Sequence, residues 1–231
     1  MSDISFFLPT RKGSNRVENK NTRSFAGIDG GLLALKLSQL IGSKLIGEII
    51  LSTNDELCIE IASKFKDPRL RIIERPDQLC LDTTPLTALI KYVPEVVRCE
   101  HVIWGHVTTP FVEGQEYDRI IDNYFKGCDE GYDSLVTVKE LQNFLIDPKT
   151  GEMINSLKGQ SGRWPRTQDL DLLYEVNHVA FVTSLNVYED LHDRIGKRKR
   201  YHVQDTVTSF DIDWGDDFLI AESIYEKHRT S

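Results

Sequence analysis

The stretch EIILSTNDELCIEIASKFKDPRLRII, residues 48–73, carries the pattern that decides the fold. Glu48–Ser52 is short, apolar and strand-like, Glu56–Lys64 has helical spacing, and Arg71–Ile73 predicts a second short strand. A strand, a helix and a strand in this order are typical of a crossover unit with two parallel strands. The stretch therefore predicts an α/β protein.

The same alternation continues on both sides of this stretch. The further expected elements are a strand at Ser5–Leu8, a helix at Leu32–Ile41, a helix at Pro85–Val97, a strand at His101–Gly105, a helix at Tyr117–Phe125, a strand at Ser134–Val138 and a last helix at about Asp217–Lys227. This rhythm indicates an open, mostly parallel α/β sheet of the Rossmann-like kind. Because ligands bind outside the carboxyl ends of such strands, the loops after Leu8, Ser52 and Gly105 and near Phe210 should hold the functional residues.

Composition narrows the class of protein. The 231 residues, 40% of them apolar, suit a single domain over 1–231, and the turn-rich stretch from Lys139 to Val176 predicts an inserted arm within it. A net charge of −8 argues against nucleic-acid and anionic-membrane partners. Four cysteines without a CxxC pair, no signal-peptide pattern and no apolar run of membrane-spanning length predict a cytoplasmic protein.

The first expected loop is unusually basic for an acidic chain. FFLPTRKGSNRVENKN, residues 6–21, collects Arg11, Lys12, Arg16 and Lys20 after the first strand. Cations, a glycine and polar side chains at a strand's carboxyl end favour a small phosphorylated ligand such as a triphosphate. The segment is neither a Walker A loop nor a dinucleotide fingerprint, because Gly13 stands alone. The alternative is a solvated surface loop whose charges bind nothing.

Two carboxylates near the C-terminus form a DxD pattern. In SFDIDWGDD, Asp211 and Asp213 are two residues apart in an extended segment, which places them on one face about 6 to 7 Å apart. Two hard oxygen ligands of this kind could hold Mg²⁺. The alternative is that both are ordinary turn acids, with Asp216 or Asp217 capping the last helix.

From end to end, the chain resembles the acylneuraminate cytidylyltransferase family, the enzymes that make CMP-sialic acid and its relatives. LPTRKGSNRVENKN matches the family's opening strand and loop, with Arg11, Gly13, Ser14, Lys20 and Asn21 in register, although Thr10 replaces the usual Ala and Asn15 the usual Lys. The other matching segments are STND at Ser52–Asp55, ERPDQLCLDTT with Arg75, Pro76, Asp82 and Thr83, HVTTPFV with Thr108 and Pro110, and the closing DIDWGDDFLIAES. The departures are His106 for the usual Gln, Val112 for a frequent Arg and His178 for the usual Gly.

The resemblance implies a nucleotidyltransferase fold and reaction. The anomeric hydroxyl of a 2-keto sugar acid would attack the α-phosphate of CTP, and pyrophosphate would leave. Arg11 and Lys20 would hold the phosphates, and Asp211 and Asp213 would bind the Mg²⁺ that bridges the phosphate and the attacking hydroxyl. The implied set for the nucleotide is Arg11, Gly13, Ser14, Asn21, Arg75 and Asp82, with Arg11, Lys20 and Asp211 as the catalytic residues.

The resemblance also implies a sugar site. His106 and Asn177 would line it, and Arg163 and Arg166 would supply a cation for the sugar carboxylate. In the family the arm that carries these arginines crosses to a neighbouring subunit, so a homodimer is expected. His106 is the one histidine expected to face the ligand, the other five being core or surface residues, and His178 would narrow the space beside the sugar.

Several alternatives stay open. The sugar could be N-acetylneuraminate, legionaminate, pseudaminate or another nine-carbon keto acid. CMP-KDO synthetases share the fold and reaction, and a module that binds nucleotide without catalysis would also keep these motifs. A nucleotide-sugar glycosyltransferase is disfavoured, because its DxD normally lies in the middle of the chain.

Overall fold

The computed structural model describes residues 3–13, 16–155 and 164–230, and within these ranges seven strands form one sheet in the order β3-β2-β1-β4-β6-β5-β7. The strands are β1 (Ile4–Pro9), β2 (Glu48–Thr53), β3 (Leu70–Glu74), β4 (His101–Trp104), β5 (Ser134–Leu141), β6 (Leu173–Ser184) and β7 (Lys199–Gln204). Among these strands, β6 alone runs antiparallel to its neighbours β4 and β5. The prediction of an open, mostly parallel α/β sheet is confirmed.

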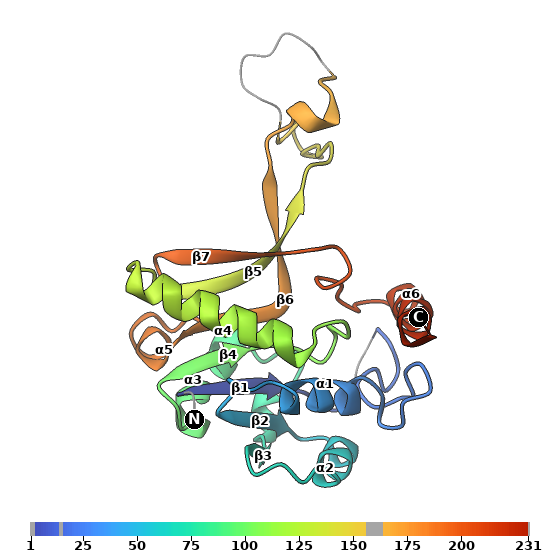
Figure 1. Ribbon diagram of the computed structural model, residues 1–231, viewed down its shortest axis with the longest axis vertical. Coiled ribbons are helices and arrows are strands. Elements are labelled where there is room, and N and C mark those ends of the chain that lie inside the picture. Colours follow the sequence, from blue (N-terminus) through green and yellow to red (C-terminus); the bar gives the residue numbers. More distant parts are fainter. Residues whose placement is uncertain (1–2, 14–15, 156–163, 231) are drawn as a thin grey trace.

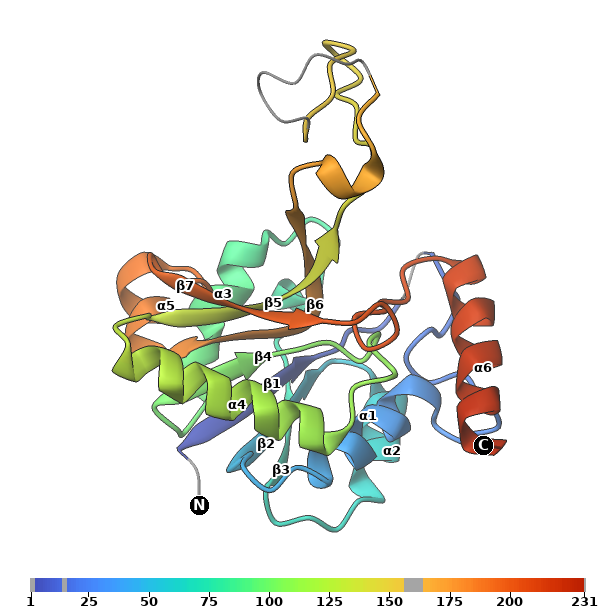
Figure 2. The same ribbon diagram turned by 45° about the horizontal axis from the view of Figure 1, so that its top comes forward.

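Helices cover both faces of the sheet (Figures 1 and 2). They are α1 (Gly31–Ile41), α2 (Glu56–Ser63), α3 (Leu86–Val96), α4 (Gly114–Asp129), α5 (Leu185–Leu191) and α6 (Gly215–Thr230). Successive strand residues point to opposite faces, so Phe6 packs into the core under α1, α2, α4 and α6, whereas Phe7 packs into the core under α3 and α5. In the described ranges no helix combines the length and apolar content needed to span a bilayer.

Local sequence signals fix where α1 and α2 begin, and therefore where the loops before them end. Gly31 starts α1 with φ +57°, and a side chain there would collide with the carbonyl oxygen of Arg23. Asp55 caps α2 by accepting a hydrogen bond from the backbone N of Leu57 at 3.0 Å. Both helices therefore begin at fixed positions beside the carboxyl edge of the sheet.

The register between β5 and β6 breaks once. Val136 pairs with Phe181 and Val138 pairs with Val176, so Thr137 lies opposite the four residues Asn177–Ala180. Such a bulge interrupts the ladder and re-aims the side chains of the bulged strand. It lies where β6 passes the carboxyl edge of the neighbouring parallel strands.

Beyond the bulge, β5 and β6 leave the body as a two-stranded ribbon that leads into the arm (Figure 1). The sequence predicts that the rhythm fails over Lys139–Val176, but β5 continues to Leu141 and β6 begins at Leu173. The irregular part is therefore shorter than predicted, because the alternating residues at its ends pair as strands.

Candidate active site

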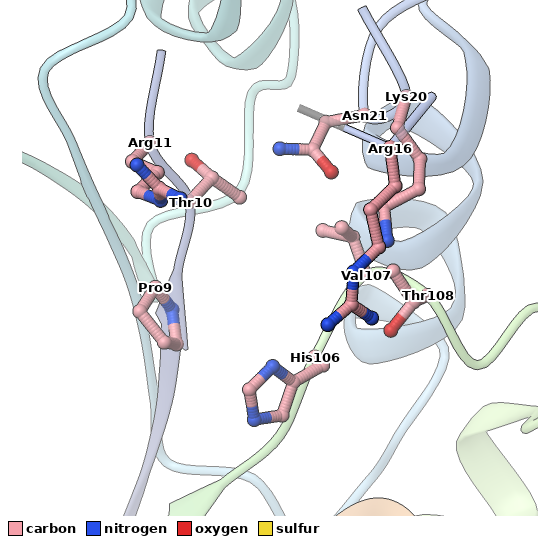
Figure 3. A pocket seen from close by; sticks show the side chains of 9 residues that line it. All are labelled: Pro9, Thr10, Arg11, Arg16, Lys20, Asn21, His106, Val107 and Thr108. Atoms are coloured by element: carbon pink, nitrogen blue, oxygen red, sulfur yellow. The ribbon is translucent and has the colours of Figure 1, made fainter. Parts of the chain in front are cut away.

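The carboxyl ends of β1 and β4 lie side by side and open into a hollow of about 380 Å³. Its lining comes from two loops and consists of Pro9, Thr10, Arg11, Arg16, Lys20, Asn21, His106, Val107 and Thr108. Figure 3 shows Arg11 on one side of this first hollow, with Arg16 and Lys20 on the other. Three cations thus surround one space, as the basic loop predicts.

Each of these cations has an internal partner. Arg11 forms an ion pair with Asp82, and Arg16 Nη1 lies 2.8 Å from Asp213 Oδ1. Lys20 Nζ donates to the carbonyl oxygen of Ile212 at 2.8 Å. Burial lowers the pKa of Lys20, although nearby carboxylates oppose the shift. The basic loop is therefore anchored to the segment that carries the DxD carboxylates.

Four of the six residues expected at the nucleotide line this hollow or the one next to it. Asn21 lines the first hollow, Gly13 adopts a φ of +80°, and Ser14 lies outside the described residues. Arg75 and Asp82 line a smaller adjoining hollow of about 220 Å³ that shares Arg11 with the first.

Arg75 is buried beneath the basic loop. Its guanidinium donates to the carbonyl oxygen of Thr10 at 2.5 Å and to Cys80 Sγ at 3.0 Å. These contacts fix the backbone at Thr10, so Arg75 holds the loop in place from below.

A second hollow of about 390 Å³ adjoins the DxD segment. It is lined by Lys139, Glu175, Val176, Asn177, His178, Thr206, Ser209, Phe210, Asp211, Asp213, Trp214 and Asp217. Both DxD carboxylates line it. Their segment was expected to be extended but is irregular backbone, held by the hydrogen bond from Ile212 N to Thr108 O at 2.9 Å. Its acidic lining contrasts with the cations of the first hollow.

His178 joins the two hollows and corrects the expectation that His106 alone faces the site. His178 Nδ1 lies 2.5 Å from Asp211 Oδ2, and its ring lies 5.1 Å from that of His106. Burial opposes ionisation of Asp211, but the hydrogen bond from His178 and the neighbouring polar and charged groups outweigh it and hold the pKa of Asp211 below its ordinary value.

His106 is kept neutral. Burial, together with the charges of His178 and Arg194, lowers the pKa of His106 to about 3. The indole N–H of Trp104 donates to His106 Nε2 at 3.2 Å, so the single ring proton must sit on Nδ1.

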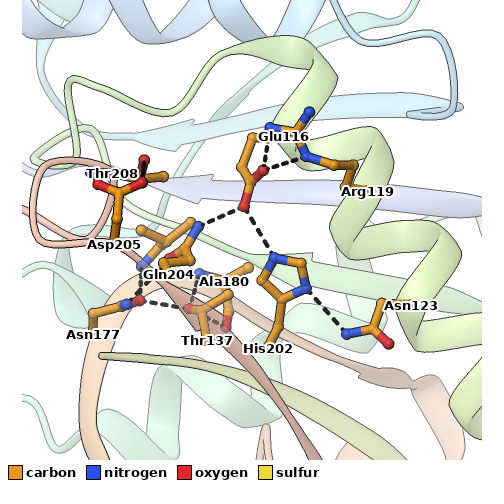
Figure 4. A network of polar contacts seen from close by, with 11 residues as sticks. Glu116, Arg119, Asn123, Thr137, Asn177, Ala180, His202, Gln204, Asp205 and Thr208 are labelled. Carbon is orange, nitrogen blue, oxygen red and sulfur yellow. Dashed lines mark hydrogen bonds and ion pairs between the residues drawn. The ribbon is translucent and has the colours of Figure 1, made fainter. Parts of the chain in front are cut away.

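A buried polar network holds the β6 bulge that presents His178 (Figure 4). Thr137 Oγ1 lies 2.6 Å from Asn177 Oδ1 and also bonds the backbone N and O of Ala180. Asn177 Nδ2 donates to Gln204 Oε1 at 3.1 Å, and Gln204 Nε2 donates to Glu116 Oε1 at 3.1 Å. One hydroxyl thus replaces part of the lost ladder, and the amide of Asn177, although beside the second hollow, is committed to this network.

Of the two arginines expected at the sugar, the structure describes Arg166, which lines neither hollow. Arg166 lies on the arm, where its guanidinium pairs with Asp169 at 2.7 Å, and Arg163 lies outside the described residues. Val112, at the family's frequent Arg position, is fully buried in the core.

Lys36 is a residue that sequence reasoning missed. It is fully buried in α1, and its Nζ donates to Thr109 O at 2.7 Å and to Tyr117 Oη at 2.9 Å. It thereby ties α1 to the loop that carries Thr108. The available signal was a single lysine inside the apolar helical run GLLALKLSQLI.

The DxD residues fit a divalent cation. Asp211 Oδ1 is buried and has no hydrogen-bond partner in the described part of the chain, while Asp213 Oδ1 is held by Arg16. A buried carboxylate oxygen without a donor is costly unless a cation or water satisfies it. Between residues 3 and 230, excluding the gaps, no group of three His, Cys, Asp or Glu side chains is placed to hold a metal ion. Two carboxylates of this kind suit a hard divalent cation that takes its other ligands from elsewhere than this chain.

A cationic hollow and an acidic hollow meet at the carboxyl edge of a doubly wound sheet, which is the architecture of a nucleotidyltransferase. A family model described as cytidylyltransferase matches residues 6–227, and the chain belongs to this family of nucleotidyltransferases. The post-translational flagellin modification protein B of Campylobacter coli is 23% identical to this chain, over 98% of this chain and 97% of its own length. A pseudaminic acid cytidylyltransferase of Campylobacter jejuni is 31% identical over 52% of this chain and 53% of its own length.

Solved structures support the fold. A CMP:2-keto-3-deoxy-manno-octonic acid synthetase complexed with CTP has a TM-score of 0.66 at 11% identity, covering 98% of this chain and 100% of that one. A 4-diphosphocytidyl-2C-methyl-D-erythritol synthase of Anaerococcus prevotii has a TM-score of 0.65 at 12% identity, covering 97% and 96%. At these identities the likeness shows the fold alone.

Proposed function

We propose that this enzyme joins CMP from CTP to the anomeric hydroxyl of a nine-carbon 2-keto sugar acid and releases pyrophosphate. The observation that carries the proposal is that the linings of the two hollows touch, through the ion pair of Arg16 with Asp213 at 2.8 Å and the rings of His106 and His178, 5.1 Å apart. A triphosphate in the first hollow and a sugar in the second would present their reacting atoms to each other there. The similarity to pseudaminic acid cytidylyltransferases supports pseudaminate as the first acid to test.

In this proposal the chain's own charges do most of the work. Arg11 and Lys20 bind the triphosphate and stabilise the charge that builds up on the leaving pyrophosphate. Gly13, Ser14 and Asn21 supply further contacts to the nucleotide, with Arg75 and Asp82 fixing the loop around Arg11. Asp211 and Asp213 would hold Mg²⁺, which when bound neutralises phosphate charge and lowers the pKa of the attacking hydroxyl.

The sugar would occupy the second hollow, next to His106 and to the backbone around Asn177. The proposal also includes a homodimer formed through the arm, in which Arg163 and Arg166 would reach a neighbouring subunit's site. Arg166 directly precedes the short 3-10 helix Thr167–Asp169, in the segment that the projecting ribbon of β5 and β6 carries away from the body, which is compatible with that role (Figure 1). The use of CTP implies a cytoplasmic reaction.

A CMP-KDO synthetase is the second candidate, favoured by the structural likeness to the octonic acid synthetase. A binding module without catalysis is the third, but the unpartnered oxygen of Asp211 between the two hollows favours an active site.

The test is pyrophosphate release from CTP with Mg²⁺ and a panel of pseudaminate, legionaminate, N-acetylneuraminate and KDO. Asp211→Ala and Lys20→Ala should abolish release. Lys12→Ala is the matched control, because Lys12 belongs to the same loop but pairs with Glu56 at 2.8 Å and does not line the first hollow. Release with KDO alone would select the second candidate, and CTP binding without release would select the third.

A further inference from the structure

Arg194 is a cation fixed on an aromatic surface beside the proposed site. It follows α5, and Asp193 Oδ1 accepts from the backbone N of Arg194 at 2.6 Å and of Ile195 at 3.2 Å, which holds the turn. The guanidinium carbon lies 3.7 Å from the ring centroid of Phe181 and 5.0 Å from that of Trp104. Two rings thus hold the planar head group of a half-buried side chain.

The N–H groups of this guanidinium are not used. Across the described residues it makes no hydrogen bond and no ion pair, and its contacts are the two rings. A guanidinium has five donors in a planar fork, and a partly desolvated charge without an acceptor is costly. Burial accordingly lowers the pKa of Arg194 from its ordinary value.

A second polar group nearby is also unsatisfied. The hydroxyl of Tyr188 is buried, its side chain is 1% exposed, and in the described part of the chain it has no hydrogen-bond partner. Arg194 and Tyr188 are near enough for each charge to shift the other's pKa. Two adjacent groups therefore lack the partner that buried polar atoms usually have.

Arg194 is one ring away from both hollows. Phe181, under the guanidinium, has its ring centroid 6.4 Å from that of His178, which lines the second hollow. Trp104, under the guanidinium, donates to His106, which lines the first hollow. The positive charge of Arg194 is near enough to help keep His106 neutral. His106 in turn lies against His178, which contacts Asp211. The aromatic surface thus continues to the point where the two hollows meet.

We propose that Arg194 receives the carboxylate of the sugar acid, an inference that rests on the proposed function. Every 2-keto sugar acid carries a carboxylate, and the fork of a guanidinium binds this group with two parallel hydrogen bonds. Two other candidate cations already have a carboxylate partner. Arg166 pairs with Asp169, and Lys139, in the second hollow, lies 3.4 Å from Glu175.

This role makes Arg194 a residue that selects acids over neutral sugars. A site built to pair with a charge rejects an analogue that lacks it, because the unpaired guanidinium then stays partly desolvated. Substrates without the carboxylate should therefore bind weakly even when the rest of the sugar fits.

The experiment measures KM for the sugar and for CTP in wild type, Arg194→Met and Arg194→Lys, with pseudaminate and with its methyl ester. Met keeps an unbranched apolar stem over the rings but removes the charge. Arg198→Met is the matched control, because the Arg198 guanidinium also stacks on a ring, that of Tyr132 at 4.8 Å. If wild type accepts N-acetylneuraminate but not pseudaminate, N-acetylneuraminate and its methyl ester are used in place of pseudaminate and its ester.

Arg194→Met should raise KM for the acid about tenfold or more, leave KM for CTP unchanged, and leave KM for the ester near the wild-type value. Arg194→Lys should recover part of the loss. Equal effects on acid and ester, or an unchanged KM for the acid, would overturn the role of Arg194 while pyrophosphate release by wild type upholds the proposed function. If wild type releases no pyrophosphate with any nine-carbon acid of the panel, the proposed function fails and this inference fails with it.

Discussion

Replacing Lys36 should change how the stability of the protein depends on pH. Lys36 is fully buried, and burial lowers its pKa from 10.5 to about 7 despite the nearby carboxylates of Glu113 and Asp211. Lys36→Met removes a group that is largely neutral in the folded protein at mildly alkaline pH but charged in the unfolded chain. The perturbation is therefore a change in proton uptake on unfolding.

The size and sign follow from the two pKa values. Between about pH 7 and 10.5 the unfolded chain binds one more proton at Lys36 than the folded protein does, so stability rises with pH by about 1.4 kcal/mol per unit. Below about pH 7 both forms are charged and the cost of burying the charge is constant, at about 5 kcal/mol. Wild type should thus gain about 2 kcal/mol relative to Lys36→Met between about pH 7.5 and 9.

Urea unfolding of both proteins across this pH range measures the difference, and contributions from unchanged groups cancel. Lys36→Gln, which stays neutral and keeps an N–H donor, should show the same dependence of stability on pH as Lys36→Met. Lys64→Met is the control, because it makes the same substitution at an exposed lysine. Parallel stability curves for wild type and both Lys36 variants would refute the reasoning, since Lys36 would then titrate as an exposed lysine does.

Three further substitutions test the site. Thr137→Val removes the hydroxyl that bonds both backbone groups of Ala180, so urea unfolding should show a loss of about 2 kcal/mol together with a lower kcat; an unchanged kcat would mean that the bulge holds its shape without Thr137. Gly105→Ala would place a methyl group 2.9 Å from the carbonyl oxygen of Val179 in the bulge, and thermal unfolding should show about 1 to 3 kcal/mol of destabilisation, whereas wild-type stability would show that the strands can move apart. Asp211→Asn keeps the shape but removes the charge, so pyrophosphate release should fall about 100-fold or more at an unchanged melting temperature, and retained activity would exclude Asp211 as a ligand or catalytic group.

The fold follows from the sequence because its signals are local. Alternating strand and helix patterns predict the elements around Glu48–Thr53. The observed ends of the predicted elements differ from the expected ones by no more than four residues. The parallel sheet and its functional edge then follow from general rules of chain connection. The sequence did not show that β5 continues to Leu141 and that β6 begins at Leu173. These two strands pair with no helix between them, so the alternation of strand and helix patterns does not reveal their ends.

The site is only partly readable for the opposite reason, namely that its geometry depends on contacts between distant segments. Arg11 and Lys20 follow a strand and could be placed at the sheet edge from position alone. His178 could not, because it reaches Asp211 through a bulge that depends on the pairing of Thr137 with Ala180. The alternation of residues in β6 does not reveal that bulge. The one available signal was His178 itself, because it stands where the family usually has a glycine.

The ion pairs of the first hollow indicate how nucleotide binding would proceed. Arg11 and Arg16 are paired with Asp82 and Asp213, and each of these side chains is 40% to 58% exposed. Such exposed pairs contribute at most about 1 kcal/mol each, so a triphosphate can replace the carboxylates at little cost. When Arg16 turns to a phosphate, Asp213 is released as a free carboxylate next to the unpartnered oxygen of Asp211. A cation that binds the two carboxylates therefore favours the same rearrangement as the triphosphate does, and by linkage each must strengthen the binding of the other.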